Sequence, residues 1–165
     1  MAGRARQWLD AADRALGAVI LFGRWLVLPV SLLLFVQWPL RDLVHAYATD
    51  ANDLAQWLFA LYVSFALTYA TREGTHLAAD AIARHYSPRL RAGIARAGAL
   101  CCVLPWSLFF LLASWPMVSQ SVRELEQFPE TYSPGYFLIK VSAWLMALLA
   151  MLQALLDLAR PPAPR

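Results

Sequence analysis

The stretch from Ala70 to Arg91, ATREGTHLAADAIARHYSPRLR, is the longest polar interruption in an otherwise apolar sequence. Two apolar segments precede it and two follow it, so it lies at the centre of the chain's topology. It is rich in arginine, and loops rich in Lys and Arg stay on the cytoplasmic side of a membrane. The side on which this stretch lies therefore sets the orientation of every segment around it.

The composition is that of a membrane protein. Hydrophobic residues make up 60% of the 165-residue chain and charged residues only 15%, against about 45–50% and about 25% in soluble domains. A soluble protein of this size would lack the polar surface needed to cover such a core. We therefore expect an all-α integral membrane protein.

Four segments are apolar over about the 20 residues that a helix needs to cross a hydrocarbon core about 30 Å thick. They cover residues 17–40, 54–71, 97–118 and 135–158, so we expect one four-helix membrane domain over residues 1–165. Between the second and third segments, a short amphipathic helix from Thr75 to about Tyr86 is expected to lie on the membrane surface.

The arginines are distributed unevenly between the two sides. The N-terminal lead-in, the central stretch and the tail carry Arg4, Arg6, Arg14, Arg72, Arg84, Arg89, Arg91, Arg96, Arg160 and Arg165. The other two loops carry only Arg41 and Arg123. By the positive-inside rule, both termini and the central stretch face the cytoplasm, and the loops around residues 41–53 and 119–133 face outward.

Two cations interrupt the apolar segments. Arg24 would cost about 2.5–3.5 kcal/mol at the centre of the bilayer, so we expect it in the cytoplasmic third, either snorkelling or paired with an acid such as Asp13 or Asp157. Lys140 lies near the outer end of the fourth segment. There it can snorkel or pair with an acid of the second outer loop, which contains Glu124, Glu126 and Glu130.

Local signals predict where three helices begin. Asn52 or Asp53 is a candidate N-cap for the second segment. Ser87-Pro88 and Ser133-Pro134 both place a capping residue before a proline, which favours the first position of a helix.

Several kinds of chemistry are disfavoured. The net charge is +3. The basic residues are placed as the membrane topology requires and not as a phosphate-binding surface would need, so no nucleic-acid partner is expected. Adjacent Cys101 and Cys102 suit apolar packing better than a disulfide or a metal site. His45, His76 and His85 lie outside the apolar segments, which argues against a haem site.

No Asp or Glu occurs in residues 17–40, 54–71, 97–118 or 135–156, so the chain offers no obvious buried proton relay of the kind that exporters use. We expect no catalytic, cofactor or metal site. A non-enzymatic partner or scaffold of another membrane subunit is the favoured function. The alternatives are a membrane anchor for an unrelated complex, such as a respiratory enzyme, and a small oligomeric channel or exporter.

The chain resembles a known family, the small membrane subunit (DctQ-like) of tripartite ATP-independent periplasmic (TRAP) transporters, from about Leu16 to Leu158. The most specific residues follow the second segment: Arg72, then His76-Leu77 and Asp80. Further similarities are Gln37, Arg41, Asp53, Tyr132-Ser133-Pro134, Lys140 and Gln153. The chain departs from the family pattern in having Asp53 where Glu is common and Arg41-Asp42 where an Arg-Tyr-like pair is common.

The resemblance implies a subunit of the bacterial inner membrane that works with two partners. A large permease subunit carries the substrate and Na⁺ sites, and a periplasmic solute-binding protein delivers an organic acid or related solute. The expected structural or partner-interface residues are Arg24, Arg72, His76, Asp80 and Lys140, with Arg72, His76 and Asp80 forming a clamp at the cytoplasmic interface. The expected outer docking surface consists of Asp50, Asp53, Glu124, Glu126 and Glu130.

Overall fold

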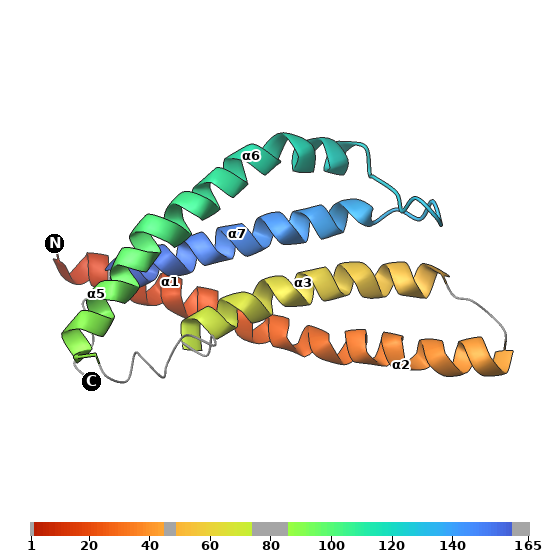
Figure 1. Cartoon of the computed structure of the whole chain (residues 1–165), viewed down its shortest axis with the longest axis horizontal. Coiled ribbons are helices and arrows are strands. Elements are labelled where there is room, and N and C mark those ends of the chain that lie inside the picture. The colour runs from red at the N-terminus through yellow and green to blue at the C-terminus, as the bar shows by residue number, and fades with distance from the viewer. Residues whose placement is uncertain (1, 45–48, 74–85, 160–165) are drawn as a thin grey trace.

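The computed structural model describes residues 2–44, 49–73 and 86–159, and these are largely helical (Figure 1). The helices in chain order are α1 (Ala2–Gly23), η1 (Arg24–Leu26), α2 (Val27–Val44), α3 (Thr49–Glu73), α5 (Pro88–Gly98), η2 (Ala99–Val103), α6 (Leu104–Arg123) and α7 (Tyr136–Ala159). Four helical stretches, Arg6–Pro39, Ala51–Glu73, Arg89–Arg123 and Tyr136–Ala159, are long and apolar enough to cross a membrane. The expected all-α class with four spanning helices is confirmed.

The helices run alternately up and down. α3 and α7 lie side by side in the centre, and α3 packs most extensively against α7. The α1–α2 rod covers the far side of α3, and the α5–α6 rod covers α7 (Figure 1). α1 begins and α7 ends at one end of the molecule, called here the N-terminal end. The loop of residues 124–135 lies at the opposite end, called here the loop end.

Two irregular turns each precede a proline within a long rod. The tight 3-10 turn η1 ends three residues before Pro29, and the wide π-helical turn η2 ends two residues before Pro105. Proline has no N–H to donate to the carbonyl four residues earlier, here Trp25 and Cys101. Each rod therefore changes its helical winding locally instead of breaking, and both remain long enough to span.

The core is small. Leu16 and Ile20 of α1 form a buried cluster with Leu149 and Leu156 of α7, and Phe65 of α3 packs against it. Between α3 and α7 the contact is made by small polar residues: Ser64 Oγ donates to the Ser142 carbonyl at 2.7 Å. Small residues of this kind let membrane helices approach closely.

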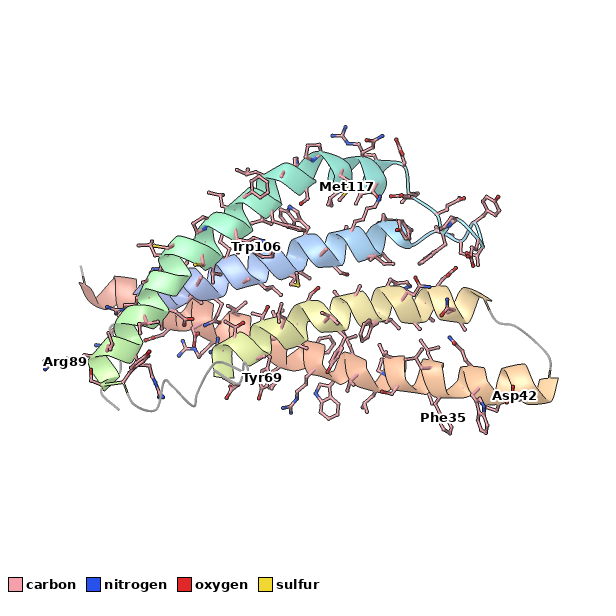
Figure 2. The ribbon with its side chains drawn as sticks, viewed as in Figure 1. Phe35, Asp42, Tyr69, Arg89, Trp106 and Met117 are labelled. Atoms are coloured by element: carbon pink, nitrogen blue, oxygen red, sulfur yellow. The ribbon has the colours of Figure 1, made fainter. Side chains whose placement is uncertain are left out.

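Most of the large apolar side chains are exposed. α2 exposes Leu28, Leu32, Phe35 and Trp38, and α6 exposes Leu108, Phe109, Leu112 and Trp115. Phe35 lies on the edge of the molecule that faces away from α3 (Figure 2). In water such a surface would be strongly unfavourable, so it requires lipid or another membrane chain as its surroundings.

The helix boundaries correct parts of the sequence prediction. The predicted caps Asn52 and Asp53 are wrong, because α3 already begins at Thr49. Ser133-Pro134 is also not a helix start, because α7 begins at Tyr136 and Pro134 forms an isolated bridge with Gln127. The loops are consequently shorter than expected, since α2 continues to Val44 and α6 to Arg123.

The third predicted start is confirmed. Ser87 caps α5 by accepting a hydrogen bond from the Leu90 N–H at 3.3 Å, with Pro88 in the first turn. The surface helix expected from Thr75 to about Tyr86 falls almost entirely outside the described residues, and Tyr86 itself lies in a bend.

Candidate functional site

At the N-terminal end, an ion pair joins α1 to α3. Arg72 Nη2 donates to Asp13 Oδ2 at 2.7 Å, and the two side chains are 24% and 12% exposed. Partial burial weakens the screening of this pair by water and makes it costly to leave either charge alone. The pair therefore fixes the last turn of α3 against the middle of α1.

Gly17 provides the space for this contact. It lies one turn after Asp13 on the same face of α1, and a Cβ added there would meet Arg72 Nη2 at 3.3 Å and Cζ at 3.4 Å. The guanidinium thus crosses α1 over a residue without a side chain. The sequence alone does not reveal this role of Gly17, because the spacing of Asp13 and Gly17 acquires meaning only once α3 is placed.

The structure gives Arg72 a partner that the sequence did not indicate, and the expected clamp with His76 and Asp80 stays a prediction. The sequence grouped it with His76 and Asp80, but both of these lie outside the described residues. Asp13, which was considered as a partner for Arg24, contacts Arg72 instead. The other acid considered for Arg24, Asp157, accepts a hydrogen bond from Gln153 Nε2 at 2.9 Å.

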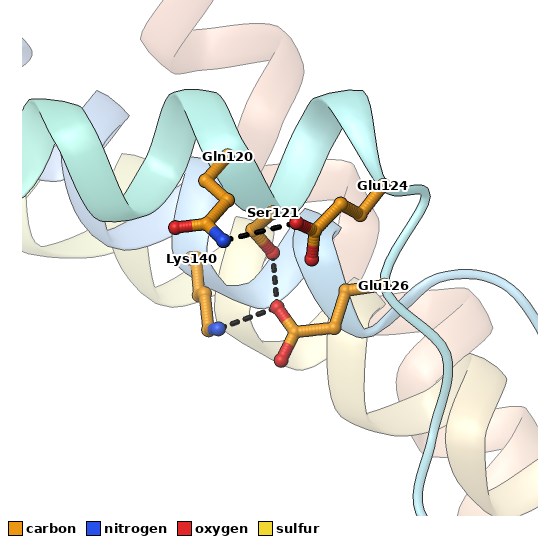
Figure 3. Close-up of polar contacts among 5 residues, drawn as sticks. All are labelled: Gln120, Ser121, Glu124, Glu126 and Lys140. Carbon is orange, nitrogen blue, oxygen red and sulfur yellow. Dashed lines mark hydrogen bonds and ion pairs between the residues drawn. The ribbon is translucent and has the colours of Figure 1, made fainter.

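At the loop end, a second polar network joins α6, the loop and α7 (Figure 3). Lys140 Nζ and Ser121 Oγ both donate to Glu126 Oε2. Beside them, Gln120 Nε2 donates to Glu124 Oε1 at 2.9 Å. Of the three acids considered for Lys140, the structure therefore pairs it with Glu126, and the ammonium also lies 5.4 Å from the ring centroid of Tyr136.

The two donors lower the pKa of Glu126 below its ordinary value. The hydrogen bond from Lys140 has the largest effect, that from Ser121 is second, and desolvation opposes both. Hydrogen bonds and a nearby cation favour the charged carboxylate, which is the direction seen here. Glu126 thus stays ionised and holds the start of the loop to α7.

The other end of the loop is attached to α3. Thr131 Oγ1 donates to Asp53 Oδ2, and the Asp53 side chain is buried. Phe128 is also buried, packing edge-on against Tyr136 with ring centroids 5.5 Å apart. The loop is therefore an ordered structure fixed to both α3 and α7.

The expected outer docking acids consequently fall into different environments. Asp53 and Glu126 make internal contacts that support the loop. Glu124 and Glu130 are exposed on its surface. Asp50 lies in the first turn of α3, and its side chain is outside the described residues.

The loop also holds two non-glycine residues in the left-handed region. Leu125 has φ +47° and Tyr132 has φ +56°, and Tyr132 is 75% exposed. This conformation is unfavourable for side chains other than Asn, Asp and Gly, and it persists only where the surroundings enforce it. The tightly bonded loop thus presents an aromatic ring outward, a feature that the sequence pattern did not reveal.

Arg24 lies apart from both networks. Among the described residues its contact is with Trp25, whose ring centroid lies 5.7 Å from the guanidinium carbon. The side chain of Arg24 is exposed. It lies within the long apolar stretch Arg6–Pro39, where an arginine exposed to lipid would be costly.

These arrangements fix α1 to α3 at the N-terminal end and hold the loop to α3 and α7 at the loop end, and no group among the described residues is arranged for bond chemistry. In the comparisons with known proteins, the family model described as "Tripartite ATP-independent periplasmic transporters, DctQ component" matches residues 30–161. No curated protein and no solved structure shows a significant match.

Proposed function

Because the chain belongs to the DctQ family of tripartite ATP-independent periplasmic transporter components, we propose that it is the small accessory membrane subunit of an ion-gradient-driven transporter for organic acids. The observation that carries this proposal is the family match, which extends over all or part of each of the four spanning helices. It is a family of transporter components rather than of enzymes. The match does not favour the two alternatives, an anchor for an unrelated complex and an oligomeric channel or exporter.

The subunit packs against the large permease subunit and stabilises it in the membrane. The exposed apolar edges of α2 and α6 support this role, because at least one of them is available to another membrane chain. Arg24, Arg72, His76, Asp80 and Lys140 belong to this structural and partner interface. Arg72 acts within the chain by holding α3 to α1 through Asp13.

The chain forms one membrane domain over residues 1–165 in the bacterial inner membrane. Its N-terminal end faces the cytoplasm and its loop end faces the periplasm. The distribution of the arginines supports this orientation, since α5 carries Arg89, Arg91 and Arg96 at the N-terminal end.

The loop end helps to dock the periplasmic solute-binding protein. Asp50, Glu124 and Glu130 belong to the docking surface, and Asp53 and Glu126 support it from inside through Thr131 and Lys140. Burial of Asp53 favours a supporting role over direct contact.

Co-expression with the large subunit and the binding protein tests the proposal. We expect a tagged form of this chain to recover the large subunit from detergent extracts, and solute uptake into proteoliposomes to require both membrane chains and the binding protein. Full uptake without this chain, or failure to recover the large subunit, would refute the assignment. Asp80→Ala and Asp13→Ala, compared in the same assay, separate a partner contact at Asp80 from the internal pair of Asp13.

A further inference from the structure

The two exposed edges of the bundle differ in charge. Along the α6 edge, the stretch from Ala97 to Val118 contains no charged residue, which suits lipid chains. Along the other edge, Leu28, Leu32, Phe35 and Trp38 recur at helical spacing and are exposed, and Arg24 precedes them at the same spacing. An apolar stripe that includes a cation is the expected pattern for a helix that meets a charged partner within the membrane.

The contact beside Arg24 fixes the direction in which it points. Gly23 is buried against α3 so closely that a Cβ there would lie 2.2 Å from Phe65 Cγ and 2.5 Å from Phe65 Cβ. Successive residues of a helix are separated by about 100°. With Gly23 facing α3, its neighbour Arg24 points about 100° away from that contact, and its side chain is exposed.

The same contact places Arg24 well away from the end of α3. Phe65 lies eight residues before the end of α3 at Glu73, a rise of about 12 Å. The guanidinium carbon lies 5.7 Å from the ring centroid of neighbouring Trp25, so the cation stays beside its own turn. Among the described residues, no carboxylate contacts it.

We propose that the α2 edge formed by Arg24, Leu28, Leu32, Phe35 and Trp38 is the surface that docks on the large permease subunit, and that Arg24 pairs there with a carboxylate of that subunit. The inference rests on the function proposed above and specifies which edge makes the contact. A carboxylate at this depth would satisfy the planar guanidinium with paired hydrogen bonds. A lipid phosphate is expected farther out, because α3 continues for about two helical turns beyond Phe65 toward the N-terminal end.

Site-specific photo-crosslinking with the co-expressed large subunit identifies the edge. A photoreactive residue is placed at Leu32 or Phe35 on α2, and at Phe109 or Leu112 on α6 as matched apolar, exposed controls. We expect adducts with the large subunit from the α2 positions and only background from the α6 positions. Adducts mainly from α6 would overturn the inference and leave the proposed function standing.

Substitution of Arg24 tests the pairing. Because loss of one partner of a desolvated charge pair weakens a complex by roughly 30-fold or more, Arg24→Gln should lower recovery of the large subunit strongly, and Arg24→Lys should retain part of it. The isolated Arg24→Gln chain should melt at the same temperature as the wild type or above it, since a lipid-facing charge has been removed.

Recovery of Arg24→Gln complexes at the wild-type level would overturn the pairing. The pairing would also be overturned if removal of anionic lipid lowered recovery by the wild type to the level of Arg24→Gln and left Arg24→Gln itself unchanged, since that result would assign Arg24 to a lipid phosphate. Failure of even the wild-type chain to recover the large subunit would instead refute the proposed function.

Discussion

Arg72 reaches Asp13 across the backbone of Gly17, with its Nη2 2.7 Å from Asp13 Oδ2 and 3.3 Å from where a Gly17 Cβ would stand. Three residues of no obvious relationship in the sequence thus form one contact between α1 and α3. The geometry of this contact depends on the lack of a side chain at Gly17 as much as on the charges of Arg72 and Asp13.

Gly17→Val should therefore destabilise the chain by about 1–3 kcal/mol, because branched methyl groups would displace the guanidinium from Asp13. The measurement is thermal unfolding in detergent. Gly93→Val on α5 is the matched control, since a Cβ there meets nothing within 4 Å. In an Arg72→Gln background, the effect of Gly17→Val should shrink, and an undiminished effect would show that the valine acts elsewhere.

A second prediction concerns Gly23 and Phe65. Gly23→Ala should cost more than the approximately 1 kcal/mol that alanine gains over glycine in a helix, because the new Cβ would overlap the base of the Phe65 side chain at 2.2–2.5 Å. Gly98→Ala, in open space within a helix, should be neutral or stabilising. If Phe65→Ala fails to rescue Gly23→Ala in unfolding experiments, the clash is not the cause.

These glycines show where sequence reasoning reaches its limit. Apolar length and arginine placement reflect local chemistry between chain and bilayer, so the four spanning helices could be predicted segment by segment. The partners of Arg72 and the roles of Gly17 and Gly23 depend on which faces of distant helices meet. No short-range pattern encodes that choice.

At the loop end, too, a contact between residues close in sequence could be predicted and a long-range contact could not. Lys140 was expected to meet one of three acids of the adjacent loop, and the structure pairs it with Glu126, which lies close in sequence. Asp53 was interpreted as a helix cap because its local context favours one, but its carboxylate accepts a hydrogen bond from Thr131. A long-range contact outweighed the local preference there.

The pair of Glu126 and Lys140 predicts a specific pH dependence. The pKa of Glu126 is lowered in the folded chain, so the pair contributes stability above the ordinary glutamate pKa of about 4.3. That contribution is lost as the pH falls through the lowered, folded-state value. The effect should be modest, because the Glu126 side chain is 33% exposed and water screens it.

Melting temperatures of wild type and Lys140→Met, measured from pH 7 down to about pH 3, provide the test. The wild type should be the more stable form near neutrality, and the difference should narrow at acid pH as Glu126 becomes protonated. A difference that stays constant across this range would indicate that Lys140 stabilises the loop through Tyr136 rather than through the carboxylate.

Gly135 should be intolerant of any side chain. Its φ of +143° lies in a region that residues with a Cβ rarely adopt, and a Cβ would also meet Phe128 Cε2 at 3.4 Å. Gly135→Ala should cost about 1–3 kcal/mol in unfolding experiments and loosen the loop. Gly93→Ala is the control. Equal stability of the two variants would contradict the conformational requirement.

Tyr132 allows stability and docking to be separated. Because asparagine tolerates the left-handed conformation better than tyrosine does, Tyr132→Asn should keep or raise the melting temperature. If the exposed ring contacts the solute-binding protein, the same variant should weaken that association, since aromatic side chains often dominate such interfaces. The association is measured by surface binding to the reconstituted complex, with Tyr86→Asn, an exposed tyrosine just before α5, as the control. Unchanged binding together with raised stability would assign Tyr132 to loop geometry alone.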